Sequence, residues 1–224
     1  MKNKKLVIVG LGETAHLAYE YFMHDSEYDV IAFSVSREYL KSDEFLKLPV
    51  VPLEELKTDY SPEDVEVFVA IASGHLNRDR IKIFDQVKGM GYKCASYVSS
   101  KCFRWHNVEI GENCFILENN TLQPFSKVGN NVVMWSGNHL GHRSVIQDNC
   151  FITSHVVISG FCVIGKNSYL GVNSAIADEI KIAENNFIAM GAIISKNTKP
   201  NKMYCGERAK DMKVDTLEYF GIMG

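Results

Sequence analysis

The sequence predicts an α/β domain followed by a parallel β-helix, and two observations carry this prediction. The first is an apolar run at residues 6–9 that ends at Gly10-Leu11-Gly12 and leads into a helical pattern. The second is an unbroken period of six, because every sixth residue from Ile110 to Ile194 is aliphatic or methionine. We therefore expect a first domain over residues 1–100, a β-helix domain over 101–207 and a C-terminal tail over 208–224.

The first domain is predicted to consist of strands that alternate with helices. The apolar run is followed by a helical pattern over 15–22, and a strand, a glycine turn and a helix are how a Rossmann-like half begins. The remaining elements are expected in the order strand 29–33, strand 67–71, helix 77–88 and short strand 93–97. This alternation within about a hundred residues predicts a small parallel sheet.

The carboxyl ends of the expected strands define a binding crevice. Gly10, Gly12, Ser34 and Ser73 all fall at such ends, where parallel α/β sheets hold their ligands. A full dinucleotide fingerprint needs a glycine where Ala15 stands and an acidic residue after the second strand, where the chain has serines. We therefore expect a nucleotide other than NAD, while the alternative is that the glycine turn only shapes the fold.

The six-residue period is typical of a β-helix in which three short strands complete one coil. Fifteen successive apolar positions correspond to about five coils, each stacking its aliphatic residue on those of its neighbours. Small residues often follow the apolar position or precede it by two, which lets the chain turn its corners. Cys114, Cys150 and Cys162 occupy such inward positions, so we expect packed thiols rather than disulfides.

Composition narrows the function classes. The chain has 224 residues, 46% of them apolar, and a formal net charge of −3 without a basic block, which argues against a nucleic-acid partner. No apolar stretch reaches 18 residues, so no membrane span is expected. The N-terminal apolar run has only four residues before a glycine, which is too short for a signal peptide, and we predict a cytoplasmic protein. No cysteine or histidine spacing is typical of zinc, so no metal is expected.

Histidines supply the candidate chemistry. Leu140 belongs to the inward series, so the neighbouring His139 faces outward, whereas His142 falls in the turn after that strand. Side chains in turns can meet a ligand, and a largely neutral imidazole is suited to act as a general base. Asn138 precedes this pair and His155 follows about two thirds of a coil later. The alternative is that these are solvated surface histidines.

The residues Val-Ile-Val-Gly-Leu-Gly at 7–12, the hexapeptide repeats and Gly-His-Arg-Ser-Val-Ile-Gln-Asp-Asn-Cys-Phe-Ile at 141–152 resemble the bacterial hexapeptide-repeat sugar acetyltransferases. That family includes the nucleotide-sugar N-acetyltransferases of bacillosamine and perosamine synthesis and the sialic acid O-acetyltransferase-like proteins. The resemblance covers the whole chain and implies a left-handed β-helix that forms a homotrimer. It further implies active sites between subunits, acetyl-CoA as co-substrate and a role in lipopolysaccharide or glycan biosynthesis.

The resemblance also implies roles for particular residues. The catalytic histidine of the family falls on His142, and its nucleotide contacts fall on Gly12, Glu13 and Thr14, in addition to Gly10, Ser34 and Ser73, which are expected from the strand ends. Asn138, His139 and Asp148 are expected to support the base. The expected acetyl-CoA contacts are His155, Gly160, Gly171, Ala189, Gly191 and Lys196, with Lys199 as an alternative to Lys196; the alternative for the glycines is that they only turn corners.

Two departures from the family pattern concern the base. The residue after the histidine is usually acidic in the family, but here it is Arg143, so the orienting carboxylate is either absent or supplied by a residue such as Glu118 or Asp148. A second family histidine falls on Phe151, and His155 is expected to substitute for it.

Three function classes follow. The first is direct acetyl transfer from acetyl-CoA to the amine of a nucleotide-linked amino sugar, with His142 as base. The second is O-acetylation of a sugar hydroxyl or a surface polysaccharide, and the third is a non-catalytic nucleotide-sugar binding protein. The charged tail after Tyr204 is expected to cap the open end of the β-helix, because an uncovered end would invite edge pairing.

Overall fold

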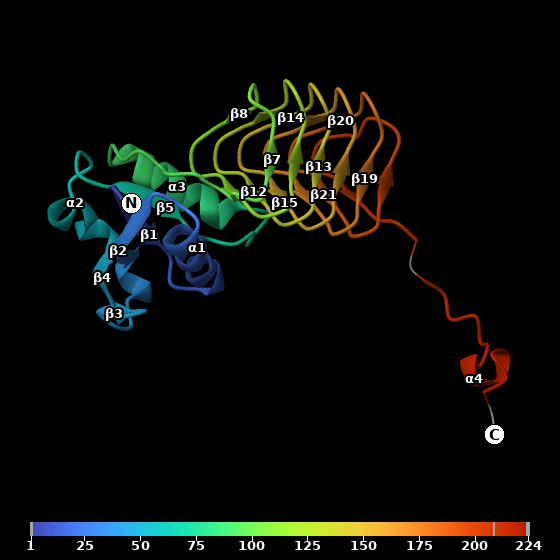
Figure 1. Cartoon of the computed structure of the whole chain (residues 1–224), viewed down its shortest axis with the longest axis horizontal. Coiled ribbons are helices and arrows are strands. Elements are labelled where there is room, and N and C mark those ends of the chain that lie inside the picture. The colour runs from blue at the N-terminus through green and yellow to red at the C-terminus, as the bar shows by residue number, and fades with distance from the viewer. Residues whose placement is uncertain (1, 208, 223–224) are drawn as a thin grey trace.

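The computed structural model describes residues 2–207 and 209–222. A small α/β sheet near the N-terminus packs against one end of a long prism with three walls, and the C-terminal segment extends away from the other end (Figure 1). None of the helices within these ranges is long and apolar enough to cross a membrane.

The N-terminal sheet has five strands in the order β3-β4-β2-β1-β5. β1 (Lys4–Val9), β2 (Tyr28–Val35), β4 (Leu48–Pro52) and β5 (Glu66–Val69) are parallel, and β3 (Glu44–Phe45) is antiparallel to β4. Two short 3₁₀ turns, Arg37–Tyr39 and Leu53–Glu55, and α2 (Leu56–Asp59) complete the connections.

Two helices cover opposite faces of this sheet because successive residues of β1 point to opposite sides. Leu6 and Ile8 share a buried cluster with Phe22 of α1 (Glu13–His24), whereas Val7 shares another with Val87 of α3 (Arg78–Gly89). The parallel α/β arrangement expected from the sequence is thus confirmed, with β3 and β4 as additional strands.

The strand expected at 93–97 does not form in this sheet. Cys94 makes only a single bridge to Val67, while β6 (Tyr97–Val98) pairs with the prism instead. Residues 93–97 are divided between the two parts of the protein because Tyr97 already pairs in register with Phe115 of the prism.

The prism consists of two-residue strands stacked in parallel into three walls. The seven-stranded wall contains β6, β9 (Phe115–Ile116), β12 (Val133–Met134), β15 (Phe151–Ile152), β18 (Tyr169–Leu170), β21 (Phe187–Ile188) and β23 (Met203–Tyr204). The six-stranded wall contains β7 (Phe103–Arg104), β10 (Thr121–Leu122), β13 (His139–Leu140), β16 (Val157–Ile158), β19 (Ala175–Ile176) and β22 (Ile193–Ile194). The five-stranded wall contains β8 (Glu109–Ile110), β11 (Lys127–Val128), β14 (Val145–Ile146), β17 (Val163–Ile164) and β20 (Lys181–Ile182).

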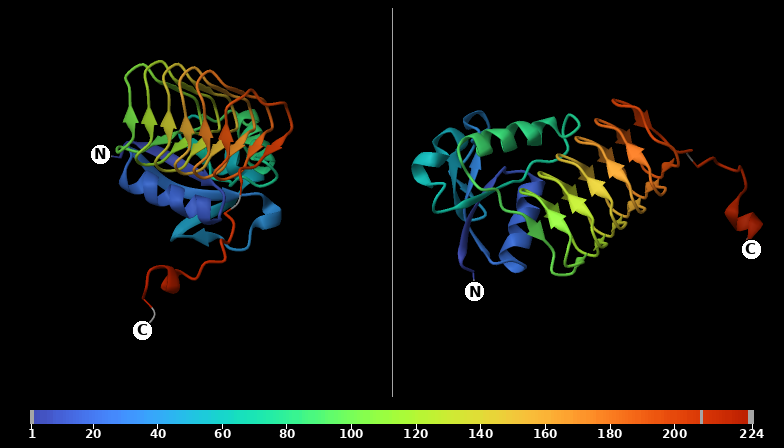
Figure 2. Two further views of the ribbon diagram at one scale, coloured as in Figure 1. Left: turned by 90° about the vertical axis from the view of Figure 1, so that its right-hand side faces the viewer. Right: turned by 90° about the horizontal axis from the view of Figure 1, so that it is seen from above.

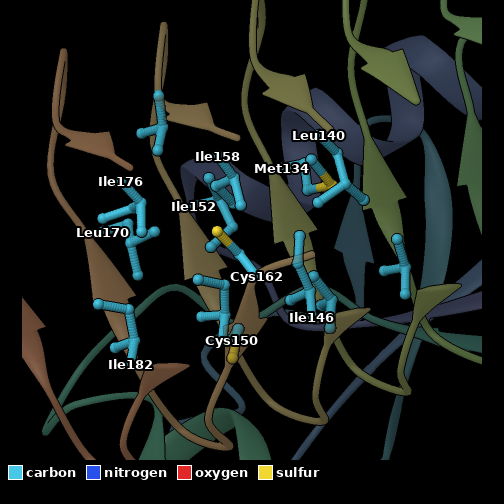
Figure 3. Packing of buried hydrophobic residues seen from close by; sticks show 14 of the residues in the cluster. Met134, Leu140, Ile146, Cys150, Ile152, Ile158, Cys162, Leu170, Ile176 and Ile182 are labelled. Carbon is cyan, nitrogen blue, oxygen red and sulfur yellow. The ribbon is translucent and has the colours of Figure 1, made fainter. Parts of the chain in front are cut away.

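The second residue of nearly every strand points into the prism and stacks on its equivalents 18 residues away. Leu122, Leu140 and Ile158 are paired in register and have no exposed surface, and Figure 3 shows this interior with Cys150 and Cys162 packed among the aliphatic side chains. All six cysteines are free, so the prediction of packed thiols is confirmed for the inward ones. Burying each large aliphatic side chain contributes about 1.5–3 kcal/mol.

The prism is longer than the sequence period indicates. Its first strands, β6 and β7, precede Ile110, and β23 follows Ile194. Arg104 interrupts the apolar series although its backbone pairs with Leu122, because its exposed side chain caps the Val108 carbonyl at 3.0 Å instead of entering the core. Together, β6, β7 and β23 make one coil more than the five that the period indicates, with two of them at the N-terminal end and one at the C-terminal end.

We name the three edges of the prism by their residues. The asparagine corner comprises residues 111–114 and the equivalents at intervals of 18, up to 183–186. The His155 corner comprises 117–120 and equivalents up to 189–192. The His142 corner comprises 123–126, 141–144, 159–162 and 177–180. Each corner contains one residue per coil in the left-handed conformation, with φ between 54° and 68° for most of them.

Asparagine fills the left-handed position at every level of the asparagine corner. Asparagine tolerates this conformation better than most residues, and here each side-chain amide donates to the next asparagine along the prism at 2.8–3.2 Å. The ladder runs through Asn113, Asn131, Asn149, Asn167, Asn185 and Asn201.

The N-terminal part docks on this ladder. Asn113 accepts from the backbone N–H of Val69 at 2.7 Å and donates to its carbonyl. Arg80 of α3 is 1% exposed and donates to the side chain and carbonyl of Asn131 and to the Cys150 carbonyl, all at 3.2 Å. Burial lowers the pKa of Arg80 to about 10, so the guanidinium stays charged at neutral pH and holds the ladder as a donor.

We predict that Asn149→Ala destabilises the protein by about 2 kcal/mol more than Asn173→Ala. Both substitutions put alanine at a left-handed position, but only Asn149 has two side-chain hydrogen bonds within the ladder, each contributing about 1 kcal/mol. Urea unfolding of the two variants measures the difference. Equal losses would show that the ladder adds nothing beyond the backbone conformation.

A second set of contacts ties α1 to the seven-stranded wall. Tyr21 donates to Glu118 at 2.9 Å, and Tyr97 donates to Asp25 at 2.6 Å. Burial alone would raise the pKa of both carboxyls, but hydrogen bonds from Ser136 to Glu118 and from Tyr97 to Asp25 outweigh it, so both pKa values lie below the ordinary ones. Burial, together with the bond to Glu118, raises the pKa of Tyr21 to about 12.

These lowered pKa values predict an acid-sensitive contact. Because the folded carboxyls hold their protons less tightly than in the unfolded chain, their stabilisation is complete above the unfolded pKa of about 4 and is lost as pH falls through the folded values. We expect the unfolding free energy of Asp25→Asn to fall less steeply between pH 5 and pH 2 than that of the native chain. Asp85→Asn, an exposed carboxylate on α3, serves as control and should keep the native steepness.

The C-terminal segment lies apart from the prism. α4 (Thr216–Tyr219) begins at Asp215, whose carboxylate accepts from the N–H groups of Leu217 and Glu218, and the described residues from 209 to 222 are exposed. Figures 1 and 2 show this segment pointing away from the last coil. The capping role expected for residues 208–224 therefore has no contact supporting it within the described residues of one chain, and it stays a prediction.

Candidate active site

The carboxyl edge of the N-terminal sheet contains a cavity of about 280 Å³. The ends of β1 and β2, the residues after β5 and one face of α3 line it, which is the place that parallel α/β sheets use for ligands. The lining residues are Val9, Gly10, Val35, Ser36, Glu38, Tyr39, Ile71, Asp79, Lys82 and Ile83.

Of the residues expected to bind the nucleotide, Gly10 lies directly in this crevice. Its φ of 130° and the Ala70 carbonyl, which a Cβ would approach to 2.7 Å, leave room for glycine only. Ser34 is fully buried next to the lining residue Val35, and its hydroxyl has no hydrogen-bond partner among the described residues. Ser73 lies in the loop after β5, where its carbonyl accepts from the Asn77 N–H.

Gly12, Glu13 and Thr14 stand at the start of α1 and do not line the crevice. Gly12 and Glu13 are exposed, and Thr14 is half-buried. The structure therefore separates these three residues from Gly10, because the chain turns away from the crevice to begin α1.

Sequence reasoning missed the charged lining. Glu38 follows the end of β2 by three residues, whereas a dinucleotide fingerprint would have its acidic residue directly after the strand. Asp79 and Lys82 project from the first turns of α3. Asp79 also contacts the ring of His75 at 2.9 Å. The helical spacing of residues 79, 82 and 83 was the available signal, since residues three and four apart share a face.

His142 lies on the prism, at the corner between the six-stranded and five-stranded walls. Its side chain is exposed, and its backbone N–H donates to Gln123 Oε1 at 2.9 Å. The imidazole packs edge-to-face on Phe161 with ring centres 5.0 Å apart. It also covers Gly160, where an added Cβ would lie 2.6 Å from the ring, so glycine and phenylalanine together set the position of the ring.

No carboxylate holds the imidazole of His142 within the described residues of one chain. Glu118 lies at the His155 corner, bound to Tyr21 and Ser136, and Asp148 lies at the asparagine corner, where it accepts from the Asn130 N–H at 2.6 Å. The expectation that either one orients His142 is wrong for a single chain, because one wall of the prism separates each from it. A carboxylate that sequence reasoning missed, Asp178, lies two coils further along the same corner and accepts from the Gly160 N–H at 2.9 Å.

The other supporting residues have structural partners. Asn138 is buried at the His155 corner and accepts from the Val156 N–H at 2.8 Å. His139 faces outward on β13 between Thr121 and Val157, as its register predicts. His155 is exposed on its own corner, where its ring covers Gly137.

The residues expected to contact acetyl-CoA divide between two corners. Gly160 and Lys196 belong to the His142 side of the six-stranded wall, whereas His155, Gly171, Ala189 and Gly191 belong to the His155 corner. Ala189 and Gly191 line an open cavity of about 550 Å³ near the last coil. Gly171 leaves no room for a Cβ, which would lie 2.5 Å from the Met190 nitrogen, so it turns the corner. One wall thus separates the two sets in a single chain.

We predict that Gly160→Ala displaces the His142 ring without unfolding the protein. The backbone of Gly160 does not need positive φ, and the group that a methyl would meet is the movable end of a side chain. We expect a change in stability below about 1 kcal/mol, with a new ring position in a crystal structure or in the histidine NMR signals. An unchanged position of the His142 ring would show that Gly160 does not determine where the ring lies.

Comparison with known proteins gives two results. No family model matches the chain, and no curated protein matches its sequence. Among solved structures, the acetyltransferase domain of PglB from Neisseria gonorrhoeae is similar, with a TM-score of 0.80 and 19% identity over 94% of this chain and 100% of that chain. A perosamine N-acetyltransferase from Caulobacter crescentus, solved with CoA and GDP-perosamine, gives a TM-score of 0.79 and 18% identity over 90% and 93%.

WeeI from Acinetobacter baumannii is also similar, with a TM-score of 0.67 and 19% identity over 91% of this chain and 97% of that chain. These likenesses extend over both the N-terminal part and the prism. The chain therefore has the same overall fold as solved sugar acetyltransferases, in agreement with the resemblance found in its sequence.

Proposed function

We propose that this protein is an acetyl-CoA-dependent N-acetyltransferase acting on a nucleotide-linked amino sugar in glycan biosynthesis. One observation carries the proposal: an exposed imidazole, that of His142, is seated by Gly160 and Phe161 at a corner of the prism. The shared fold supports it, because similar structures were solved with acetyl-CoA or with CoA and GDP-perosamine. Acetyl-CoA would enter as co-substrate rather than as a resident cofactor.

In this proposal the transfer is direct. The sugar nitrogen attacks the thioester carbonyl, the imidazole of His142 takes the proton of that nitrogen, and the C–S bond breaks to release CoA, which regains the proton. A positioned base contributes about 10²- to 10⁴-fold to such a step. Since the Gly160 and Phe161 N–H groups are already hydrogen-bonded within the chain, we place the donor to the oxyanion on a neighbouring subunit.

We propose a homotrimer with the active sites between subunits. The six-stranded wall lies between the two corners that hold the candidate residues, and three of its outward side chains, Phe103, Val157 and Ile193, are 44–78% exposed. Burying this wall against another copy would remove apolar surface from water. It would also bring the His155 corner of one subunit toward the His142 corner of the next, which joins the two sets that one chain keeps apart.

The nucleotide would bind in the N-terminal crevice. Tyr39 offers an aromatic face, Lys82 a cation for phosphate, and the unpartnered Ser34 hydroxyl lies buried beside the lining. In this proposal residues 1–100 form a Rossmann-like substrate domain, 101–207 a left-handed β-helix and 208–224 a capping tail. The protein would act in the cytoplasm, where nucleotide sugars and acetyl-CoA are available.

One observation supports a second candidate function, a nucleotide-sugar binding protein without catalysis. His142 has no carboxylate partner among residues 2–207 and 209–222, and a base without an orienting group is less effective. O-acetylation of a sugar hydroxyl uses the same residues, so the acceptor distinguishes it from N-acetylation.

We expect His142→Ala to lower kcat by at least about a hundredfold, because the general base is removed, while acetyl-CoA binding is largely kept. The measurement is thiol release from acetyl-CoA with UDP-, GDP- and dTDP-linked 3-amino and 4-amino sugars and with their hydroxyl counterparts. His106→Ala, an exposed histidine at the equivalent position two coils earlier along the same edge of the prism, is the matched control and should keep full activity. Turnover that survives in His142→Ala refutes the base, and binding of a nucleotide sugar without any turnover supports the second candidate.

A further inference from the structure

The left-handed positions of the His142 corner are occupied by unusual residues. Where the asparagine corner has asparagine throughout, this corner has Phe125, Arg143, Phe161 and Glu179, with φ between 57° and 63°. Side chains with a Cβ other than asparagine or aspartate rarely adopt this conformation. Because asparagine would make the same turn with less strain, these side chains serve something other than the turn, and strain of this kind clusters at functional sites.

Three of these residues form one shelf beside His142, which we call the aromatic shelf: Phe125, Arg143 and Phe161. The guanidinium of Arg143 lies 4.5 Å from the centre of the Phe125 ring, and the Phe161 ring contacts His142. Both phenylalanines are 51% exposed. Coils are about 4.8 Å apart, so the shelf extends about 10 Å, which matches a pyranose ring with its substituents.

The charge of Arg143 has no carboxylate partner in the part of the chain that the structure describes. No carboxylate lies within ion-pair distance of it among residues 2–207 and 209–222, and no side-chain hydrogen bond uses its donors there. The position of the guanidinium over the Phe125 ring leaves its fork of N–H donors free. Such a fork matches a carboxylate in a bidentate pair.

We propose that the aromatic shelf selects an acceptor sugar that carries a carboxylate close to the acetylated position, and this inference rests on the proposed function. Arg143 follows His142 directly, so their Cα atoms are about 3.8 Å apart. A carboxylate paired with Arg143 would bind at the same corner as the imidazole, with the sugar ring on the phenylalanines and the attacking group toward His142. The diphosphate of a nucleotide sugar is attached at the anomeric carbon and would bind in the N-terminal crevice, where Lys82 is available.

The test compares two acceptors that differ in one group, a UDP-linked 4-amino hexose and the same sugar oxidised to the C6 carboxylate. We expect the native protein to prefer the carboxylate by about tenfold or more in kcat/KM, mainly through KM, as for a charged hydrogen-bonded pair. Arg143→Gln should abolish this preference and keep turnover of the neutral sugar, and Arg143→Lys should restore part of it. Lys181→Gln, an exposed cation on β20, is the matched control and should keep the native preference.

A second arm does not depend on turnover. The Arg143 Nε–H signal is followed by NMR while D-glucuronate or D-glucose is added, and we expect a shift with glucuronate only. If no acceptor is acetylated but this shift occurs, the proposed function fails and the anion-selective shelf stands.

Two outcomes would overturn the inference. One is equal preference for the carboxylate sugar in the native protein and in Arg143→Gln, whatever the level of activity. The other is unchanged selectivity combined with dissociation of an oligomer in Arg143→Gln by sedimentation, which would assign Arg143 to a contact between subunits.

Discussion

The buried Arg80 on the asparagine ladder is the interaction on which the rest of the structure depends. A buried guanidinium needs hydrogen-bond acceptors for its donors, and here side-chain and main-chain oxygens of the prism accept from Nε and Nη2 of Arg80, while Nη1 has no hydrogen-bond partner among the described residues. Because α3 carries Arg80 on one side and Asp79 and Lys82 of the crevice on another, the docking of the prism also fixes the crevice. The two parts of the proposed site are held by one helix.

The three corners of the prism have the same backbone conformation but different roles. All turn through left-handed residues, so the coil geometry leaves the identity of those residues free to vary wherever strain is tolerated. Asparagine is kept where amides stack and a domain docks. At the His142 corner, aromatic and charged residues take the same conformation, and their side chains reach into solvent beside the imidazole.

The imidazole of His142 is positioned by shape rather than by charge. Gly160 leaves the space that the ring occupies, and Phe161 limits its rotation. The contrast with an acid-oriented histidine follows from Arg143, which stands where a carboxylate would be expected and whose guanidinium lies over the Phe125 ring. In the proposed function, a neighbouring subunit and the acceptor itself complete the surroundings of the base, which is why a single chain shows only half of them.

The sequence by itself determined the prism, its inward residues and the α/β start, because periods of six and strand-helix alternation are local patterns. It also placed His142 in a turn and His139 outward, since register follows directly from the position of Leu140. Only the tertiary structure decided which side chains lie at the same corner as His142. Asp148 and Glu118 are close to His142 in sequence or repeat number but lie beyond intervening walls, whereas Phe161 and Asp178 come to its corner because one coil takes 18 residues. The docking by Arg80 also needed the structure, because no local pattern shows that a helical arginine will find its acceptors on carbonyl groups about 50 to 70 residues away.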